Sequence, residues 1–230
     1  MKIIWLGHAG FRIEIAGEVL LVDPWLSGNP MFPDARRADA IGGATAILLS
    51  HGHGDHASDV IAIAKELSIP VIGIFDLMSY WAESEGIATV GFNKGGTVTQ
   101  GDVRITMVSA AHSSSLTTPD GPRYAGGEAG YMIAGEGKTI YFSGDTDVMA
   151  DMAVFQALHA PDIGLLCAGG HFTMDMRRAA YAAKTFFDFD TVIPCHYRTF
   201  PLLEQSAEVL EAELPGVTVI EPEVLEPITL

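Results

Sequence analysis

Seven histidine and aspartate side chains of this 230-residue chain have the types and spacing of metal ligands. Four lie within six residues and three are distant in the sequence; the set is His51, His53, Asp55, His56, His112, Asp145 and His196. Imidazole nitrogen and carboxylate oxygen both bind Zn²⁺ at about 2.0–2.2 Å. So many polar groups gathered at one place would be costly to bury without partners. The pattern therefore predicts a metal site.

The six-residue segment predicts that the ligands divide between two cations. One glycine separates His51 from His53, so both rings can reach one ion from a tight loop, and the two glycines of the segment supply backbone freedom. Asp55 and His56 are then expected to point the other way and to hold a second ion. A carboxylate can bridge two cations because it has two oxygens, and Asp145 is the residue we expect in that role.

Such a site predicts hydrolysis. A water molecule shared by two cations loses a proton near neutral pH and becomes a hydroxide nucleophile, while one cation can polarise a carbonyl or phosphoryl oxygen. We therefore expect a dinuclear zinc hydrolase that uses a metal-bound hydroxide to cleave a small ester, lactone or phosphoester, with Mn²⁺ or Fe as other candidate metals. Asp55 and Asp145 are the predicted catalytic residues, and Asp55 could orient the hydroxide or relay its proton.

Four further residues are candidates for contacts with the substrate or with the ligands. Asp23 could accept the second N–H of a ligating histidine, or it could cap a turn. His8, in a Gly-His-Ala-Gly turn, could face the cleft or be an ordinary turn histidine. His171, in a glycine-rich loop, is expected to face the substrate. Arg198, with Tyr197, could stabilise developing negative charge or lie at the surface.

The elements that must position these residues are strands. The ligand segment and the distant ligands follow four expected strands, at residues 44–50, 103–109, 139–143 and 191–194. Ends of strands at one sheet edge form a rigid place where loops can converge. We expect further strands at 2–6, 11–15, 18–22, 68–74, 97–100, 129–134 and 163–166, and helices at 58–67, 76–85, 149–158, 176–187 and 204–213. This mixture predicts sheets packed together and flanked by helices, a four-layer α/β fold in one domain over residues 1–230.

The amino-acid composition restricts the classes of partner that we expect for this protein. The net charge of −16 disfavours nucleic acid and anionic membranes, so a small-molecule substrate is expected. No apolar run reaches the roughly 18 residues that would cross a bilayer, and the start of the chain lacks the pattern of a signal peptide. A cytoplasmic location is therefore predicted. The two cysteines, Cys167 and Cys195, are expected to be reduced, with Cys195 a small core residue.

The segment from His51 to His56 resembles the HxHxDH signature of the metallo-β-lactamase superfamily, and the distant ligands follow in that superfamily's order. The chain is most similar to the metal-dependent hydrolases akin to L-ascorbate-6-phosphate lactonase; the supporting segments include Gly7–Phe11, Asp23–Trp25, Gly28–Pro30, Ala111–Ser114, Gly130–Tyr131, His171–Met174 and Pro194–Tyr197. The resemblance implies an αββα sandwich with the site at one edge between the sheets. It also implies self-association.

The resemblance further implies how the ligands divide. One metal ion would be held by His51, His53 and His112, another by Asp55, His56 and His196, and Asp145 would be shared. It does not imply cleavage of β-lactams, because this fold and its site are reused for many substrates.

Three other functions are weighed against hydrolysis. A di-iron oxygen-handling oxidoreductase would carry a glutamate where His53 stands and would need an appended flavin domain. A non-catalytic metal-binding or sensing module would lack a ligand, whereas all seven are present. An RNA-processing nuclease would need a basic or glycine-rich arm. The loop at residues 113–127 could act as a lid, and Arg123 within it would suit an anionic substrate.

Overall fold

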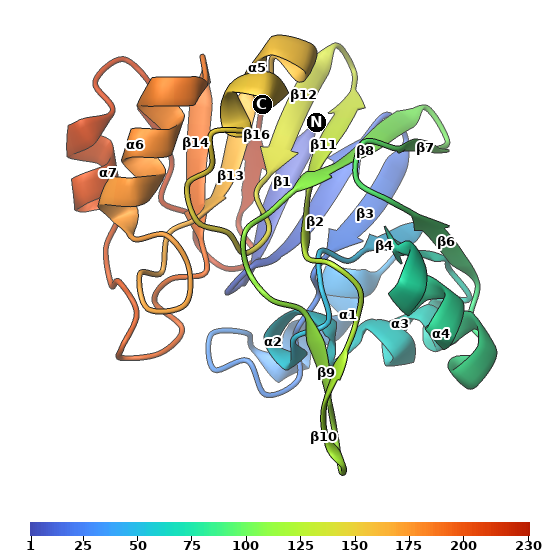
Figure 1. Ribbon diagram of the computed structural model, residues 1–230. Coiled ribbons are helices and arrows are strands. Elements are labelled where there is room, and N and C mark those ends of the chain that lie inside the picture. Colours follow the sequence, from blue (N-terminus) through green and yellow to red (C-terminus); the bar gives the residue numbers. More distant parts are fainter.

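Two seven-stranded sheets packed face to face form the centre of the computed structural model, which describes residues 1–230 (Figure 1). The first sheet, in the order β16-β1-β2-β3-β4-β5-β6, contains β1 (Lys2–Gly7), β2 (Gly10–Ile15), β3 (Glu18–Val22), β4 (Ala46–Leu48), β5 (Val71–Ile74), β6 (Thr89–Phe92) and β16 (Pro227–Thr229). The second, in the order β15-β14-β13-β12-β11-β8-β7, contains β7 (Thr97–Gln100), β8 (Val103–Ser109), β11 (Ala129–Gly135), β12 (Lys138–Phe142), β13 (Ile163–Cys167), β14 (Thr191–Cys195) and β15 (Thr218–Val219).

The two sheets have the same internal plan. In the first, β16, β1, β2 and β3 pair antiparallel, and β3 to β6 continue in parallel. In the second, β7, β8, β11 and β12 pair antiparallel, and β12 to β15 continue in parallel. The inner parallel strands β4, β5 and β13 read as apolar runs, as buried strands do. Strands β5, β13 and β14 are buried along their whole length.

Helices cover the outer faces of both sheets. Helices α3 (Val60–Leu67) and α4 (Phe75–Glu85) lie beside the first sheet, and α6 (Met176–Phe186) and α7 (Glu208–Glu213) beside the second (Figure 1). The buried face of α6 contains four alanines, which allow the helix to approach β13 closely. The remaining helices are η1 (Asp34–Arg36), α1 (Arg37–Ile41), α2 (Gly54–Ala57) and α5 (Met152–His159). The predicted αββα arrangement is confirmed.

One hydrophobic cluster of 64 buried residues draws on both sheets and on the helices. The rings of Phe11 and Phe142 meet across the sheets with centroids 6.2 Å apart. The Tyr131 hydroxyl donates a hydrogen bond at 2.5 Å to the carbonyl oxygen of Leu49 in the opposite half. The core thus fixes the two sheets relative to each other. No helix combines the length and the hydrophobicity that a bilayer-spanning segment needs.

Most predicted elements are present, with three kinds of difference. Strand β5 begins at Val71 rather than at residue 68, because Ser68 ends α3 in the left-handed conformation with φ 55°. Helices α5 and α7 begin three and four residues later than expected. The short strands β6, β15 and β16 and the helices α1 and α2 were not predicted.

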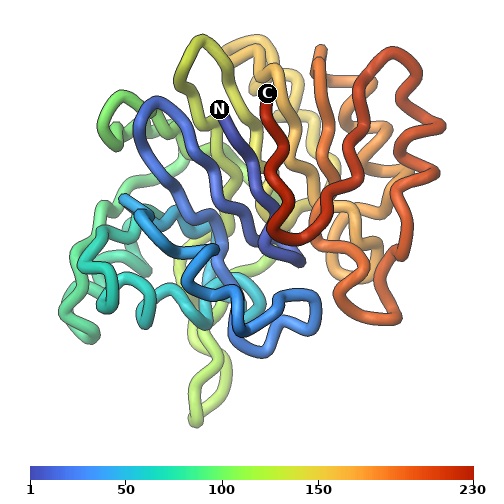
Figure 2. Tube along the Cα trace, turned by 180° about the vertical axis from the view of Figure 1, so that it is seen from behind, coloured from blue at the N-terminus to red at the C-terminus, as the bar shows by residue number.

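The loop expected at residues 113–127 is largely a two-stranded hairpin. Strands β9 (Ser115–Thr118) and β10 (Gly121–Tyr124) pair antiparallel with each other and with no strand of the large sheets. The hairpin projects away from the two sheets in both views (Figures 1 and 2). Both of its strands are therefore free to form the wall of a cavity beside the sheets.

Candidate metal centre

The candidate ligands meet at one edge of the two sheets. Each follows a strand or short loop directly: His8 after β1, Asp23 after β3, the segment from His51 to His56 after β4, His112 after β8, Asp145 after β12 and His196 after β14. Three of these strands belong to the first sheet and three to the second. The rigid core therefore brings together side chains that lie up to 188 residues apart (His196 minus His8).

The carboxylate of Asp145 lies at the middle of the cluster. Its Oδ2 atom is 3.1 Å from Nε2 of His196 and 3.3 Å from Nε2 of His56. The same oxygen is 3.5 Å from Nε2 of His112 and 3.9 Å from Nε2 of His51. Four imidazoles thus turn the same ring nitrogen toward one buried oxygen, an arrangement in which a shared ligand would sit.

The other donors form two groups on either side of Asp145. In one group, His51, His53 and His112 have donor atoms within 4.8 Å of one another. In the other, Asp55, His56 and His196, together with His8, meet the same criterion. This division is the one that the resemblance implies, with His8 as an additional member. A third group, Asp23 with His51 and His56, overlaps both because Asp23 lies behind these donors.

Several donor atoms at this place have no partner within the chain, and this gives a test of whether a cation fits. Nε2 of His56, both ring nitrogens of His196 and Oδ1 of Asp145 are buried without a hydrogen bond. Leaving a polar atom buried and unsatisfied costs about 1–3 kcal/mol. A divalent cation would satisfy atoms of this kind, and imidazole with carboxylate is a donor set that such cations accept. The residues therefore fit a metal centre.

The electrostatics of the imidazoles agree with this fit. Burial, with the neighbouring His56, keeps the pKa of His51 well below its usual value, so this ring is neutral and can donate a lone pair. Burial opposes the charged form of His56, but Asp145 and Asp23 on its two sides outweigh burial and raise its pKa well above the usual value. The carboxylates thus favour positive charge at the position of the His56 ring, which a metal ion can provide in place of a proton.

Asp23 holds one of these rings from behind. Its Oδ2 accepts a hydrogen bond from Nδ1 of His56 at 2.7 Å, and its Oδ1 accepts one from the backbone N–H of Ser50 at 2.8 Å. The Ser50 hydroxyl also donates to Asp23 and lies 2.9 Å from Nδ1 of His51. One fully buried carboxylate therefore fulfils both roles considered from the sequence, since it fixes a histidine tautomer and ties down a turn. Ser50 was not predicted; its only signal is its place before the ligand segment.

His8 plays a similar part toward Asp55. Its Nε2 is 3.1 Å from Oδ2 of Asp55, and its Nδ1 is 2.8 Å from the hydroxyl oxygen of Thr199. Burial, with the charge of His196, lowers the pKa of His8 to about 4, so the ring is neutral. Because a carboxylate only accepts, Nε2 carries the hydrogen and Nδ1 accepts from the threonine. Burial opposes ionisation of Asp55, but this hydrogen bond and His56 hold its pKa below the usual range.

The backbone is strained where these residues sit. Four residues in or beside the site have positive φ without being glycine: His8 (52°), Asp23 (45°), His196 (59°) and Arg198 (66°). Such conformations cost free energy and persist only where surrounding contacts hold them. The carbonyl oxygen of His8 accepts hydrogen bonds at 2.8 Å from the His196 N–H and from Nε1 of Trp5. These contacts join the ends of β1 and β14 and stabilise the strained backbone conformation.

The two glycines of the ligand segment, Gly52 and Gly54, differ in whether the structure requires a glycine there. A Cβ atom at Gly52 would lie 2.6 Å from Cβ of Ala125, so only glycine fits there. A Cβ atom at Gly54 would meet nothing within 4 Å, and this residue begins α2 without a positive φ. The prediction that both glycines are needed for backbone freedom is therefore wrong: Gly52 is required by close approach, and Gly54 is not required.

Two of the weaker candidates lie away from the donors. His171 is exposed and borders a hollow with Leu202 and Glu204, while its neighbour Phe172 lines the space in front of the ligands. The guanidinium of Arg198 lies 3.5 Å from Glu221 and 3.4 Å from Glu223, because the chain turns sharply here and the acidic C-terminal segment attracts it. The surface position is thus the one that Arg198 takes of the two considered from the sequence, and a substrate-facing His171 stays a prediction. The ring of Tyr197 stacks on Trp5 with centroids 5.6 Å apart.

Both cysteines lie in the core beside the site. Cys195 and Cys167 are register partners on adjacent parallel strands, and both are free thiols. Burial raises the pKa of Cys195 well above its usual value, which keeps the thiol protonated. The prediction of reduced cysteines with Cys195 in the core is confirmed.

A cavity of about 380 Å³ opens in front of the donors, and we call it the metal cavity. It is lined by His53, Gly54, Asp55, His112, Ser113, Asp145, Phe172 and His196. Small-molecule sites have volumes of about 300–1,000 Å³. The Ser113 hydroxyl is 3.4 Å from Nε2 of His53, and the Phe172 side chain is half exposed at the mouth. The donors therefore face a space in which a small substrate could be held.

The chain is similar to known proteins over most of its length. The family described as "Beta-lactamase superfamily domain" matches residues 19–197, which is most of the chain. The chain belongs to the beta-lactamase superfamily. Within it, the chain is 68% identical over 230 residues, all of both sequences, to a protein of Dinoroseobacter shibae named UPF0173 metal-dependent hydrolase. The prediction of a metal-dependent hydrolase of this superfamily is confirmed.

Solved structures of the superfamily agree with the fold. Igni18, described as a novel metallo hydrolase from the hyperthermophilic archaeon Ignicoccus hospitalis, is 28% identical with a TM-score of 0.85, and the match covers 99% of this chain and 97% of that one. The metallo-beta-lactamase fold protein YhfI from Bacillus subtilis is 15% identical with a TM-score of 0.74 and covers 99% of each chain, which shows the fold alone.

Proposed function

We propose that this hydrolase cleaves a small ester, lactone or phosphoester at a centre of two divalent cations, with zinc as the first choice. The observation that carries the proposal is the position of Asp145 Oδ2, which lies 3.1–3.9 Å from Nε2 of four histidines. Those histidines belong to two separate donor groups. One carboxylate between two donor groups is the arrangement that a dinuclear centre needs, because each of its oxygens can take part.

In this proposal each donor group holds one cation. His51, His53 and His112 would hold the first, Asp55, His56 and His196 would hold the second, and Asp145 would be shared. When bound, a pair of divalent cations activates water near neutral pH and polarises the oxygen of the bond to be cleaved.

The chain's own residues then have distinct tasks. Asp23 takes the Nδ1 hydrogen of His56, so that Nε2 of this ring is directed at the centre without a hydrogen. His8 donates to Oδ2 of Asp55 and thereby orients this carboxylate, whose side chain is 33% exposed toward the metal cavity. Because Asp55 is both fixed and accessible, it can accept a proton from the attacking water or pass one to the leaving group. His8 and Asp23 are accordingly positioning residues.

The substrate class follows from the cavity and the charge. A space of about 380 Å³ suits a small molecule, and the half-exposed ring of Phe172 offers an apolar contact to its non-reacting part. The net charge of −16 opposes the approach of nucleic acid and of anionic membranes. A small uncharged or singly charged ester or lactone is therefore the first substrate to test.

The experiment joins metal analysis to a substrate screen. Wild-type protein and the His53→Ala and Asp145→Ala variants are assayed with nitrophenyl esters, lactones and phosphodiesters, with and without a chelator, while bound metal is counted by mass spectrometry. We expect two cations per wild-type chain, and loss of metal together with activity in both variants. The His159→Ala variant, at the end of α5 and away from the centre, is the matched control.

Full activity and full metal content in either ligand variant would overturn the proposed mechanism. A coloured, redox-active protein without hydrolytic activity would instead favour the di-iron oxidoreductase alternative. Stable metal binding with no turnover of any ester or phosphodiester would favour the sensing module.

A further inference from the structure

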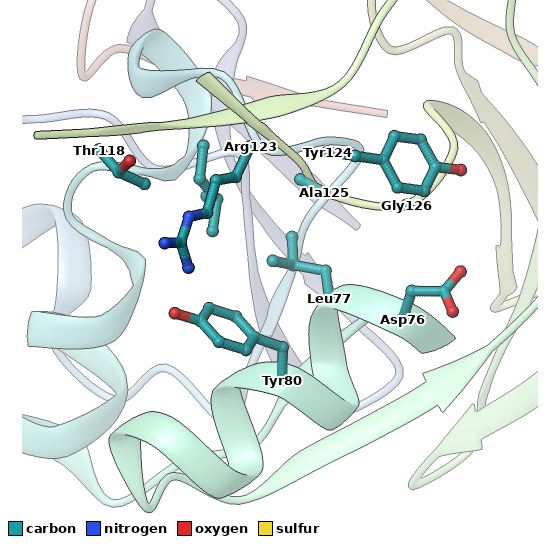
Figure 3. A pocket seen from close by; sticks show the side chains of 9 residues that line it. Asp76, Leu77, Tyr80, Thr118, Arg123, Tyr124, Ala125 and Gly126 are labelled. Carbon is teal, nitrogen blue, oxygen red and sulfur yellow. The ribbon is translucent and has the colours of Figure 1, made fainter. Parts of the chain in front are cut away.

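A second cavity, of about 270 Å³, lies between helix α4 and the β9–β10 hairpin (Figure 3). We call it the hairpin cavity. Its walls come from the side of α4 and from both strands of the hairpin, and none of its residues lines the metal cavity. The proposed hydrolysis makes no use of it. Its volume is close to the lower limit of small-molecule sites.

One end of the hairpin cavity is polar. Arg123 from β10 and Tyr80 from α4 turn their guanidinium and hydroxyl groups toward the same space, and Thr118 from β9 lies beside them (Figure 3). The Thr118 hydroxyl donates its hydrogen to the carbonyl oxygen of Gly121 at 2.7 Å within the hairpin, so it is not a donor to a ligand. The Tyr80 hydroxyl can donate. This end therefore offers a positive charge with one hydroxyl donor beside it.

The guanidinium of Arg123 makes only a long, exposed ion pair with a carboxylate of its own chain. Its nearest acidic oxygen, on Asp120, is 3.7 Å away, and both side chains are largely exposed. By contrast, Arg12, Arg37 and Arg178 hold carboxylates at 2.6–2.8 Å. Because the ion pair of Arg123 is long and open to solvent, it is weak, and the planar set of donors of this arginine stays available over the cavity. A carboxylate is the group that this set binds best.

The rest of the cavity is apolar and ends at an acidic residue. Leu77, Leu116 and the ring of Tyr80 form its walls. Asp76 lies on the far side of Leu77 from Arg123 (Figure 3). A second anionic group at that end would be repelled. The chemistry therefore selects a molecule with one anionic group and a flat apolar body.

Close packing gives the cavity a fixed shape and joins it to the metal centre. A Cβ atom at Gly126 would lie 2.6 Å from Ile74, just before α4, so the hairpin and the helix are wedged together. On the other side, Ala125 packs against Gly52, between the ligands His51 and His53. A molecule in the hairpin cavity would thus contact the same element that borders the ligand segment.

We propose that the hairpin cavity binds a small aromatic or acyl carboxylate, with the carboxylate at Arg123 and Tyr80 and the apolar body over Leu77 and Leu116. This binding site is independent of the proposed hydrolysis and does not require it.

Benzoate and its neutral analogue benzamide are suitable probes. Metal-replete, isotope-labelled protein is titrated with each, and backbone amide shifts are followed by NMR. We expect saturable shifts with benzoate at Leu77, Leu116 and Gly126, and weak ones with benzamide. Arg123→Gln should weaken benzoate binding at least about tenfold, because a charge-assisted pair is lost. Arg177→Gln, which removes another exposed arginine, should bind benzoate as the wild type does.

Two further results would decide against the proposal. Shifts confined to His53, Ser113 and Phe172 would mean that the carboxylate binds only at the metal cavity. Equal affinity for benzoate and benzamide, or unchanged benzoate affinity in Arg123→Gln, would mean that the guanidinium of Arg123 does not bind the carboxylate. Tyr80→Phe keeps the ring and removes the hydroxyl, so it should weaken benzoate binding by about threefold to tenfold. The amide spectrum of each variant shows directly that it is folded.

Discussion

The metal centre and the hairpin cavity are built in opposite ways. At the centre, most donor side chains are buried, and Asp23 and His8 each make two or more polar contacts while their backbone is held in a strained conformation. At the hairpin cavity, Arg123 and Tyr124 are largely exposed, and the one ion pair of the arginine, with Asp120, is long at 3.7 Å. The centre sits on strands of both large sheets, whereas the hairpin pairs only with itself.

This difference matches the two proposed roles, which are catalysis at the metal centre and ligand recognition at the hairpin cavity. A reacting centre needs donors held within a fraction of an ångström, which strands and a shared core can supply. Recognition of a ligand tolerates more adjustment and can be placed on a projecting hairpin. The two regions meet where Ala125 packs on Gly52. Changes on the strand side should therefore affect metal and stability, and changes on the outer hairpin should affect neither.

The largest expected effect is the loss of stability on removing metal. At a free metal concentration of about 1,000 times the Kd, each site contributes about 4 kcal/mol to the free energy of unfolding. In a chain of this size, about 1 kcal/mol shifts Tm by roughly 2–4 °C. Chelator-treated protein should therefore melt on the order of 10 °C or more below metal-replete protein in calorimetry. Identical melting with and without metal would show that the buried donors do not depend on a cation.

The two glycines of the ligand segment should respond differently to alanine. Gly52→Ala places a methyl group 2.6 Å from Ala125, and such overpacking costs about 1–3 kcal/mol. Gly54→Ala faces open space and should change the free energy of unfolding by less than about 0.5 kcal/mol. Urea denaturation of both variants measures the contrast. Equal losses would mean that the hairpin base does not press on the ligand segment.

Asp23→Ala should weaken metal binding, although Asp23 is not itself a proposed ligand. It removes the acceptor for Nδ1 of His56, and the loss of such a supporting carboxylate costs about 10–100-fold in metal affinity. Competition with a chromophoric chelator measures the affinity. Asp59→Ala is a useful comparison, because Asp59 ties down the loop at Leu26 and Ser27 rather than a donor. If both variants bind metal equally well, Asp23 is only a turn residue.

The smallest effect is expected at Thr199, which supports the centre through His8. Thr199→Val keeps the shape and removes the hydroxyl 2.8 Å from Nδ1, so kcat should fall by about threefold to tenfold while metal content and KM stay unchanged. Thr199→Ser should restore kcat because it keeps the hydroxyl. A loss in both variants, or a change in KM alone, would contradict a positioning role for His8.

The sequence predicted those parts of the fold and of the site in which a local residue pattern coincides with a chemical function. The segment from His51 to His56 is short and dense in donors, and the strands around it are apolar runs, so the donors and most strands could be predicted. The superfamily and its metal-dependent hydrolase activity could be predicted from the same segment.

The contacts of the site could not be predicted in the same way. Ser50 and Thr199 are common residue types whose roles arise only because β4 ends beside β3 and β14 ends beside β1. Arg198 follows a predicted ligand, yet the positive φ there turns it to Glu221 and Glu223, which sequence spacing does not reveal. Short edge strands such as β15 and β16 carry too few residues for a periodic pattern.

The most direct test of the central claim is a crystal structure of the metal-replete protein with anomalous scattering measured at the metal edges. We predict two anomalous peaks on either side of Oδ2 of Asp145. One should lie among His51, His53 and His112, and the other among Asp55, His56 and His196. A single peak, or peaks away from Asp145, would contradict the dinuclear centre on which the proposed hydrolysis depends.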